Sequence, residues 1–407
     1  MHNVALKNIK DTEVKGKRVL VRLDLNVPVK DHVILDDARL RATIPTLKDL
    51  MQRGAKVILM SHFGRPSGRD PALSLSFLVE PMGTLLGTKV AFCRETTGQD
   101  AAAQVRAMLS GEVLLLENAR FDPREEANDM DFARELAALG DFYVNDAFSV
   151  SHRAHASVEA IAHLLPAFGG TCLVREVDAL TKALAAPTRP LCAVVAGSKI
   201  STKLALLENL IQKVDILMLG GGIANTFLRA QGFGMGGSLV EMSMLGTARD
   251  VMEKARARGC QIVLPQDAVV ALDTAGTNVR TCALEDIAPE EKMFDIGPLS
   301  VATFSSFLDK SATLVWNGPL GVFETPPFHK GTVALAREAA RLTQMGSLFS
   351  IGGGGETVAA LSQAGAANLF SYISLAGGAF LEFLEGKELP GISALAQSAQ
   401  EAMSKSL

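Results

Sequence analysis

The segment 350–357 combines residue types that could bind a phosphate group. Four glycines at 352–355 follow a short apolar run and precede Glu356, Thr357 and an apolar-periodic stretch. This order predicts a strand, a bare loop and the start of a helix. Glycine allows the backbone to approach a bulky anion, and a helix N-terminus presents unpaired N–H groups to it. A tight turn without a ligand explains an isolated glycine run equally well, so the rest of the chain must decide.

Other glycine-rich loops recur through the C-terminal half, at 196–203, 220–222 and 316–324. Lys199 and Lys203 stand where a helix is predicted to begin, which suits a di- or triphosphate, although the segment lacks the GxxxxGK[ST] pattern of a P-loop. Apolar and glycine surfaces suit a flat base, and Glu324 could hold a ribose hydroxyl. Structural glycines in tight turns are the alternative at each of these positions.

Cationic side chains recur in the N-terminal half. Polar or charged residues follow four of the predicted strands, in the segments 24–26, 61–66, 117–121 and 145–155. Arginine or histidine is present in the last three segments, and Arg22, Arg39 and Arg41 add to the set. Because a guanidinium group matches phosphate and carboxylate oxygens in pairs, this pattern predicts a site for a small polyanion. A solvated surface charge is the simpler explanation of any one residue, but the repetition after four strands argues against it.

Short apolar runs that alternate with helical periods must position these residues. Candidate strands lie at 19–23, 57–60, 113–116, 142–144, 191–195, 216–219, 262–264, 314–316 and 348–351. Apolar residues spaced three and four apart predict helices between them, for example at 204–214 and at 40–51, where Pro45 suggests a kink. The alternation predicts an α/β fold of two doubly wound, parallel-sheet, Rossmann-like domains, with ligands beyond the carboxyl ends of the strands.

Length and composition limit the class of protein. With 407 residues, 48% of them apolar, we expect two domains, and a net charge of −4 argues against nucleic-acid binding. Five scattered cysteines without a CxxC pair predict buried thiols of a reducing compartment, not zinc or disulfides. No apolar run is long enough to span a membrane, and the charged segment 1–11 lacks a signal-peptide core. We therefore expect a cytoplasmic protein.

The two halves favour different ligands, an oxyanion in the cationic half and a nucleotide in the glycine-rich half. Two such sites facing a cleft between domains form the arrangement of a phosphoryl-transfer enzyme. We expect the domain boundary near 170–190, with a helix at 171–187 as a hinge whose closure excludes water.

In their order along the chain, these motifs resemble those of the phosphoglycerate kinase family, and the resemblance covers essentially the whole sequence. The matching segments are 22–28 RLDLNVP, 61–66 SHFGRP, 117–121 ENARF, 145–148 NDAF, 152–155 HRAH, 198–203 SKISTK, 220–222 GGG, 316–319 WNGP and the final glycine run. Taken together the series is highly specific. It implies reversible phosphoryl transfer between 1,3-bisphosphoglycerate and ADP, which gives 3-phosphoglycerate and ATP.

The resemblance also implies roles for individual residues. The domain at 1–170, with the tail 390–407 packed back on it, would bind 3-phosphoglycerate through Asp24, Asn26, Arg39, His62, Arg65, Arg120 and Arg153. The domain at 188–389 would bind ADP or ATP through Gly197, Lys199, Lys203, Gly221, Gly222, Gly297, Asn317, Pro319, Val322, Glu324, Gly353, Gly354, Gly355, Glu356 and Thr357. A monomer is also implied.

The implied chemistry requires no general base, because a carboxylate or a terminal phosphate oxygen needs no proton removed before it attacks. The sequence contains no evident nucleophile–base set. We expect catalysis by alignment and charge stabilisation, with Arg39, Lys199 and Lys203 as the catalytic cations and one Mg²⁺ carried by the nucleotide. Glu356 would approach that Mg²⁺ as its protein ligand.

Two segments depart from the family pattern. Glu356 stands where the family has aspartate, and its extra methylene displaces the carboxylate from an ion that tolerates irregular geometry badly. The segment 374–379 reads SLAGGA where the family usually reads STGGGA, so Leu375 removes a hydroxyl group and Ala376 adds a Cβ near the phosphates.

These departures leave a second hypothesis open, a catalytically weakened relative that acts as a nucleotide- or 3-phosphoglycerate-binding protein. The intact cationic set argues against it. A dinucleotide-dependent oxidoreductase would need GxGxxG after an early strand and an acid about 20 residues further on, and the chain has neither. We expect small-molecule substrates, and neither nucleic acid nor membrane as a partner.

Overall fold

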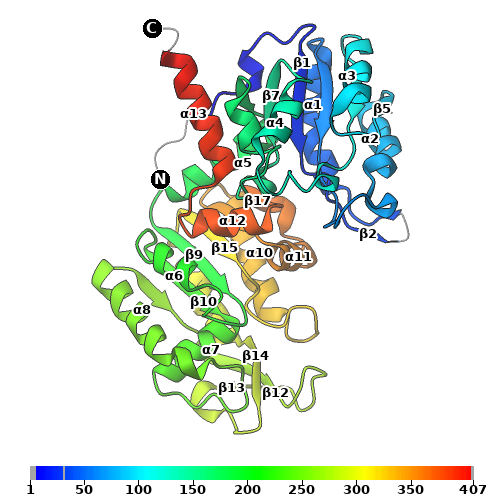
Figure 1. Cartoon of the computed structure of the whole chain (residues 1–407). Helices are drawn as coiled ribbons and strands as arrows, with labels where there is room; N and C mark the ends of the chain where they lie inside the picture. The colour runs from blue at the N-terminus through cyan, green and yellow to red at the C-terminus, as the bar shows by residue number, and fades with distance from the viewer. Residues whose placement is uncertain (1–5, 31–32, 405–407) are drawn as a thin grey trace. The chain divides into compact units, whose positions relative to one another are not determined.

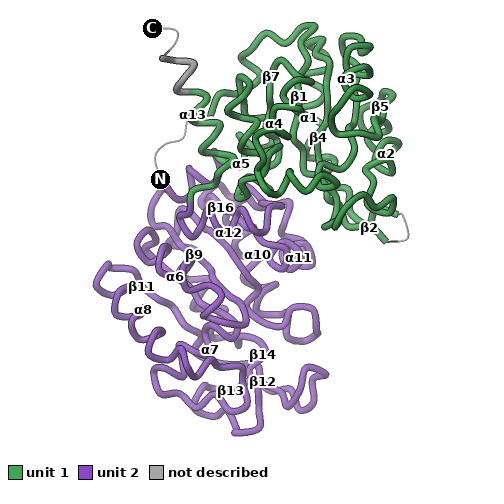
Figure 2. The backbone as a smooth tube through the Cα atoms, viewed as in Figure 1, with its two compact units in different colours: residues 1–178, 388–407 green, residues 179–387 purple. Residues whose placement is uncertain are grey.

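The computed structural model describes the backbone of residues 6–30 and 33–404, and their side chains as far as residue 399. The chain forms two compact units, whose elements are labelled in Figure 1 and which Figure 2 distinguishes by colour. Unit 1 extends to Asp178 and resumes at Glu388, and unit 2 comprises Ala179–Lys387. The first five residues of the charged N-terminal segment and the last three of the predicted tail lie outside the described residues.

Unit 1 contains six parallel strands in the order β5-β6-β4-β1-β7-β8. Their bounds are β1 Arg18–Leu23, β4 Lys56–Met60, β5 Val90–Phe92, β6 Val113–Leu115, β7 Phe142–Asp146 and β8 Ala167–Gly169. The central strands are nearly continuous apolar runs because both of their faces are buried. The chain leaves β1 toward one edge of the sheet and later adds β7 on the other side. The carboxyl ends of these two strands therefore form the switch point at which open α/β sheets bind ligands.

The helices of unit 1 are α1 Ala38–Gln52, α2 Val79–Leu86, α3 Gly98–Ala107, α4 Met130–Ala137 and α13 Pro390–Ser404, and α5 Thr171–Leu184 runs from unit 1 into unit 2. Shorter elements are η1 Ile9–Asp11, η2 Pro71–Leu73, η3 Leu75–Leu78, η4 Ala119–Phe121, η5 Phe148–Val150, η6 Ala160–His163 and the hairpin β2 Val29–Lys30 with β3 Val33–Ile34. Helix α13 is fixed within unit 1, since the Gly391 N–H donates to the Ser151 carbonyl oxygen at 2.9 Å and the Ala167 N–H donates to Ser398 Oγ at 3.2 Å.

Unit 2 contains a second parallel sheet in the order β11-β10-β9-β15-β16-β17. Its strands are β9 Leu191–Ala196, β10 Ile216–Gly220, β11 Gln261–Val263, β15 Thr313–Asn317, β16 Phe349–Gly353 and β17 Tyr372–Ser374. Counted along the chain, this is the 3-2-1-4-5-6 order of a doubly wound dinucleotide fold, so the switch point lies between β9 and β15.

The helices of unit 2 are α6 Leu204–Leu210, α7 Gly221–Ala230, α8 Leu245–Arg258, α9 Pro298–Leu308, α10 Lys330–Gln344, α11 Gly355–Gln363 and α12 Gly377–Leu384, with the short turns η7 Met242–Met244, η8 Leu284–Asp286 and η9 Ala367–Leu369. Across both units, no helix in the described part of the chain has the length and apolar character that a membrane crossing needs.

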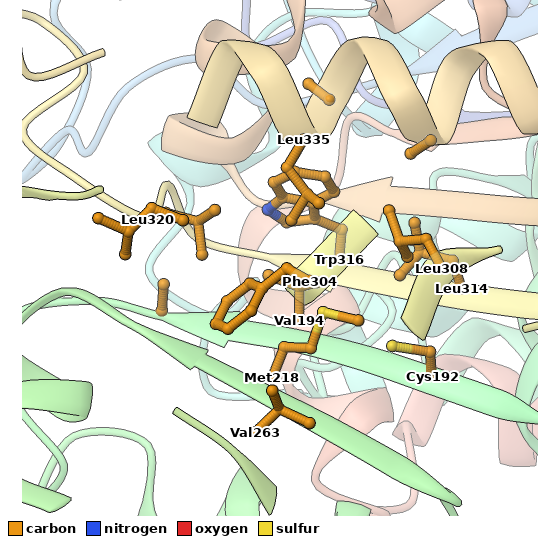
Figure 3. Packing of buried hydrophobic residues seen from close by; sticks show 14 of the residues in the cluster. Cys192, Val194, Met218, Val263, Phe304, Leu308, Leu314, Trp316, Leu320 and Leu335 are labelled. Carbon is orange, nitrogen blue, oxygen red and sulfur yellow. The ribbon is translucent and has the colours of Figure 1, made fainter. Parts of the chain in front are cut away.

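Trp316 anchors the core of unit 2 beside the switch point. Its fully buried ring lies among apolar side chains that include Val194, Phe304 and Leu335 (Figure 3). The indole N–H donates to the Gly318 carbonyl oxygen at 2.8 Å. A buried indole N–H requires such a partner, so the core itself fixes the start of the loop that follows β15.

The prediction of two parallel sheets is confirmed, and all nine predicted strands are present with ends shifted by at most two residues. The sequence did not reveal β5, β8 and β17, which are too short to produce a periodic pattern. It also did not reveal the antiparallel sheet of β12 Asp267–Ala271, β13 Arg280–Ala283 and β14 Lys292–Ile296, in which β13 is mostly exposed. Helix α1 runs from Ala38 to Gln52 without a break at Pro45.

Asp267 connects this small sheet to helix α9. Although it follows a predicted strand, its carboxylate serves the helix and not a ligand. It accepts hydrogen bonds from the Leu299 N–H at 2.9 Å, the Ser300 N–H at 2.8 Å and the Ser300 hydroxyl at 2.5 Å. These bonds satisfy donors of the first helical turn that otherwise have no partner within the helix.

We predict that Asp267→Ala lowers the free energy of unfolding of unit 2 by about 1–2 kcal/mol, the usual effect of losing a helix cap. Urea unfolding followed by circular dichroism measures the change. Asp250→Ala on the exposed side of α8 is the control and should stay within about 0.5 kcal/mol of the unsubstituted chain. Equal effects of the two substitutions would contradict a capping role for Asp267.

Candidate active site

The carboxyl end of β1 carries an ion pair at the switch point of unit 1. Asp24 directly follows the strand, and its carboxylate lies 2.9 Å from the Arg39 guanidinium. The same carboxylate accepts hydrogen bonds from the Ser149 hydroxyl at 2.5 Å and from the Asn26 N–H at 3.1 Å. The structure thus brings together three predicted residues, Asp24, Asn26 and Arg39. Ser149 completes the group, and its hydroxyl carried no signal in the sequence.

A cluster of cationic and histidine side chains lies at the ends of the neighbouring strands. His62 is 4% exposed, and its Nδ1 lies 3.1 Å from Arg22 Nη2. Burial lowers the pKa of His62 well below its ordinary value, and the guanidinium groups of Arg22, Arg120 and Arg153 lower it further. Burial also lowers the pKa of Arg120, which donates to the Gly64 carbonyl oxygen at 2.8 Å. These predicted residues are therefore close enough for the charge of each arginine to act on His62.

The acids near this cluster do not compensate its positive charge fully. Glu126 lies 3.0 Å from Arg120 Nε, but its own side chain is 57% exposed. The fully buried Glu125 directs its carboxylate to the N–H and hydroxyl of Ser157. Charges that are removed from water without complete pairing are unfavourable. A phosphate or carboxylate anion would supply the missing negative charge, which supports an anion site at this edge of the sheet.

Two other arginines have different surroundings. Arg65 is exposed on the loop that follows β4. Arg41 pairs with Asp37 at 2.7 Å within α1, and its side chain is 65% exposed. The hydrogen bond to Asp37 raises the pKa of Arg41. Arg41 is therefore engaged by a local acid one turn away, whereas Arg39, two residues earlier, contacts Asp24.

Unit 2 contains a cavity of about 510 Å³ at the carboxyl ends of its strands. Its walls come from the loops after β9 and β15, from α7 and the loop that follows it, from β14 and from the first turn of α11. Predicted nucleotide-binding residues that line it are Gly197, Gly221, Gly222, Pro319, Val322, Glu324 and Glu356. A concave site of this size with few polar groups is typical of small-molecule binding.

Two glycines at this site are required by the backbone itself. A Cβ at Gly222 would lie 2.2 Å from the Ser198 carbonyl oxygen, so a side chain would force the start of α7 away from the loop after β9. Gly354 has a φ of +99°, and a Cβ there would lie 2.9 Å from Asn317 Nδ2. At both positions the backbone of the fold therefore requires glycine, whether or not a ligand binds. At Gly222, which lines the cavity, the missing side chain also leaves bare backbone facing the cavity, as a phosphate site requires.

Lys203 is held at the point where β9, β15 and β16 end. Its Nζ donates to the Ala196 carbonyl oxygen and to Asn317 Oδ1, each at 2.6 Å. Asn317 Nδ2 in turn donates to the Gly353 carbonyl oxygen at 2.9 Å, so one amide joins the lysine to the glycine run. Burial lowers the pKa of Lys203 to about 8, and the Glu356 carboxylate opposes that shift.

The remaining predicted residues occupy varied positions around this network. Thr357 Oγ1 accepts the Gly318 N–H at 2.7 Å, and Gly355 is the exposed first residue of α11. Lys199 is exposed on the loop after β9. Gly297 is not among the residues that line the cavity. A Cβ there would lie 2.2 Å from Asp267 Oδ2, so Gly297 makes room for the carboxylate that caps α9.

Glu356 is suitably placed for a metal that arrives with a nucleotide. It lies exposed in the first turn of α11 and lines the cavity. Throughout residues 6–30 and 33–404, no group of three or more His, Cys, Asp or Glu side chains is arranged to hold a metal ion. Mg²⁺ commonly binds through one or two carboxylates plus substrate phosphates, so Glu356 fits that ion.

Asp295 also lines the cavity, but its oxygens are engaged elsewhere. They accept hydrogen bonds from the Gly331 N–H at 2.7 Å and the Ile296 N–H at 2.9 Å. Burial raises the pKa of Asp295 to about 7, so this carboxyl group is partly protonated near neutral pH. Both features make it a poorer metal ligand than Glu356.

Several residues that line the cavity were not named as binding residues. Ser198, Leu320 and Gly321 lie within predicted loops, whereas Asn225, Gly237, Leu239, Lys292, Met293, Phe294 and Asp295 lie outside them. Asn225 follows the three glycines by one helical turn, so helical spacing could have indicated it. Lys292 and Phe294 belong to β14, and no sequence pattern placed that antiparallel sheet beside the site. The two departures at 375–376 are not among the lining residues. Leu375 is 37% exposed, and Ala376 is buried with its N–H donating to Ser374 Oγ at 3.2 Å.

Known proteins resemble this chain over nearly its whole length. A family model described as phosphoglycerate kinase matches residues 9–387. The phosphoglycerate kinase of Zymomonas mobilis is 54% identical over 385 residues, 94% of this chain and 97% of that protein. The phosphoglycerate kinase of Rhodospirillum centenum is 54% identical over 394 residues, 96% of this chain and 100% of that protein. A solved structure of phosphoglycerate kinase from Coxiella burnetii has a TM-score of 0.90 at 40% identity, covering 97% of this chain and 99% of that chain.

We predict that ADP binding at pH 8.5 is accompanied by proton uptake at Lys203. With its pKa at about 8 in the free protein, the side chain is largely neutral at this pH, and a polyphosphate favours its charged form. The affinity for ADP should therefore fall as pH rises through about 8. Titration calorimetry in two buffers of different ionisation enthalpy measures the uptake. It should disappear in Lys203→Arg, whose side chain stays charged, and persistence there would assign the proton to another group.

Proposed function

The chain belongs to the phosphoglycerate kinase family, and from this premise we propose how its residues perform the family's reaction. It is a phosphotransferase of glycolysis that transfers a phosphoryl group reversibly between 1,3-bisphosphoglycerate and ADP, with 3-phosphoglycerate and ATP as products. The acceptor group in the reverse direction is a carboxylate.

In our proposal unit 1 binds 3-phosphoglycerate at the carboxyl ends of β1, β4, β6 and β7. The supporting observation is the incompletely paired cationic cluster around His62, Arg120 and Arg153. An anion with a phosphate at one end and a carboxylate at the other meets its charge requirement. Asp24 and Asn26 would bind the hydroxyl and carboxyl end, and Arg39 and Arg65 would complete the basic set.

Unit 2 would bind ADP or ATP in the cavity that Gly221 and Val322 help to line. The apolar walls suit the base, and Glu324 is available to the ribose hydroxyls. The phosphates would extend toward Lys199, Lys203 and the N-terminus of α11, where backbone N–H groups and the helix dipole favour negative charge.

The observation that carries the mechanism is the placement of Lys203. A partly desolvated ammonium group at fixed oxygens is already oriented when charge spreads over the transferring phosphoryl group. Preorganised charge of this kind accelerates transfer without a proton acceptor, because neither a carboxylate nor a phosphate oxygen must be deprotonated first. Arg39 would supply the corresponding charge from unit 1. Closure of the two units over both substrates stays a prediction.

Three finer points belong to the same proposal. Mg²⁺ would enter with the nucleotide, with Glu356 as its protein ligand, and would neutralise part of the phosphate charge. The five cysteines, all within the described residues, form no disulfide; four are buried, as predicted, and Cys172 is half-buried. A cytoplasmic location in a reducing compartment is part of the proposal. The chain would act as a monomer.

The direct test is a coupled assay of ATP formation from 1,3-bisphosphoglycerate and ADP. Turnover would establish the proposal. Nucleotide binding without turnover would indicate the weakened, binding-only relative, which no observation in the described residues favours.

We predict that Lys203→Met lowers kcat by about 10²–10³, the typical effect of removing one preorganised group that stabilises the transition state. Steady-state kinetics of ATP formation measures it, and circular dichroism checks the fold. Lys213→Met is a matched control, since burial also lowers the pKa of Lys213, but this residue precedes β10 and so lies at the amino ends of the strands. A kcat near that of the unsubstituted enzyme would remove Lys203 from the mechanism.

We predict that Glu356→Gln raises the Mg²⁺ concentration needed for half-maximal activity by at least about tenfold, because a coordinating charge is lost. Glu356→Asp should retain most of the Mg²⁺ affinity, because the carboxylate remains and only its distance from the backbone becomes shorter. Magnesium titrations at saturating ADP measure both effects, with Glu253→Gln on α8 as control. An unchanged requirement in Glu356→Gln would show that the ion is held by nucleotide and water alone.

A further inference from the structure

Arg22 occupies the buried interior of unit 1 beside the cationic cluster. Its side chain is 1% exposed, and each of its guanidinium nitrogens has a partner. Nε donates to Ser157 Oγ at 2.9 Å, Nη1 donates to the Leu23 carbonyl oxygen at 2.5 Å, and Nη2 lies 3.1 Å from His62 Nδ1. These partners hold the guanidinium group of Arg22 in one orientation within the core.

The contact with Arg22 determines which nitrogen of His62 carries a proton. A guanidinium group has only donors and remains charged in proteins, so Nδ1 must accept the hydrogen bond with its lone pair. An imidazole whose Nδ1 accepts is neutral, and its single proton lies on Nε2. The other charged and titratable groups that act on His62 are Arg120, Arg153 and His155, and all of them also disfavour a second proton.

A second layer of hydrogen bonds orients Arg22. The Ser157 hydroxyl donates to Glu125 Oε1 at 2.5 Å, and the Ser157 N–H donates to Glu125 Oε2 at 2.9 Å. Because this hydroxyl proton is committed to the carboxylate, Ser157 Oγ presents its lone pair to Arg22 Nε. The buried Glu125 accepts from Ser157, Ser157 accepts from Arg22, and His62 accepts from Arg22, so the donor and the acceptor of each bond in this chain are fixed.

We propose that Arg22, held by Ser157 and Glu125, is a positioning residue that keeps His62 as a neutral Nε2–H donor. His62 then recognises an oxygen of the substrate by a directional hydrogen bond and adds no positive charge, and the arginines alone match the charge of the anion. This inference rests on the proposed binding of 3-phosphoglycerate to unit 1.

The first test reads the tautomer directly in the unsubstituted full-length chain. With ¹⁵N-labelled histidine, long-range ¹H–¹⁵N spectra distinguish the two neutral tautomers and the imidazolium, and His62→Gln assigns the signal among the seven histidines. The expected result is the Nε2–H form, without the titration that an ordinary histidine shows at a pKa of about 6.5. An imidazolium, or a proton on Nδ1, would overturn the proposal.

Addition of 3-phosphoglycerate to the same sample separates this inference from the proposed function. A shift of the Nε2 signal with the tautomer unchanged supports both. An Nε2–H tautomer that does not respond to saturating 3-phosphoglycerate would contradict binding at this site, while the tautomer assignment would stand.

The second test releases His62 from Arg22. The double substitution Arg22→Met with Glu125→Gln removes both buried charges together, so neither is left unpaired. His62 should then titrate nearer its ordinary pKa of about 6.5. Because a protonated His62 attracts the anion, the KM of the variant for 3-phosphoglycerate, divided by that of the unsubstituted enzyme at the same pH, should fall on acidification. For each unit by which binding raises the pKa of His62, this ratio can fall by up to about tenfold. A ratio that does not change with pH would indicate a purely structural role and overturn the proposal.

A matched control removes an arginine and a carboxylate at the other end of β1. Arg18 and Asp141 pair at 2.6 Å near the start of β1, away from its carboxyl end. Arg18→Met with Asp141→Asn should leave the His62 tautomer and the pH dependence of KM unchanged. If the Arg22 double variant fails to fold, the spectra of the unsubstituted chain still decide the question.

Discussion

The partial burial of the Lys203 ammonium group is the constraint on which the site of unit 2 depends. A cation withdrawn from water requires oxygens close by, and the Ala196 carbonyl and the Asn317 amide provide them at 2.6 Å. The same Asn317 amide holds the Gly353 carbonyl at the end of β16. The hydrogen bonds that satisfy this one charge therefore link the carboxyl ends of β9, β15 and β16. The loops that follow these strands offer a surface on which a polyphosphate can lie.

In unit 1 the buried cations are arginines. Arg22 is fully satisfied inside the core, whereas Arg120 and Arg153 lie near His62 without enough acids to match them. Each unit therefore holds positive charge that a bound anion would compensate. This arrangement suits phosphoryl transfer between two weakly basic oxygens, since the reaction needs charge in fixed positions and no proton acceptor.

Conformational and packing requirements account for several motif residues that do not face a ligand. Gly297 matches the family pattern, yet it makes room for the Asp267 carboxylate at the N-terminus of α9. Arg41 belongs to the cationic series by position, but a local acid engages it on the surface of α1. A motif can thus contain residues that support the fold of a site together with residues placed to contact a ligand, and only their surroundings distinguish the two groups.

The sequence by itself determined the alternation of strands and helices, the two parallel sheets, the cationic and glycine-rich strand ends, and the family, because these depend on short-range patterns. Tertiary structure alone decided the depressed pKa of Lys203, the tautomer of His62 and the placement of Lys292 and Phe294 beside the cavity. The interacting groups there are distant in sequence: Arg22 meets Ser157 across 135 residues, and Lys203 meets Asn317 across 114. Burial and hydrogen-bond direction are properties of such encounters, so no local pattern could contain them.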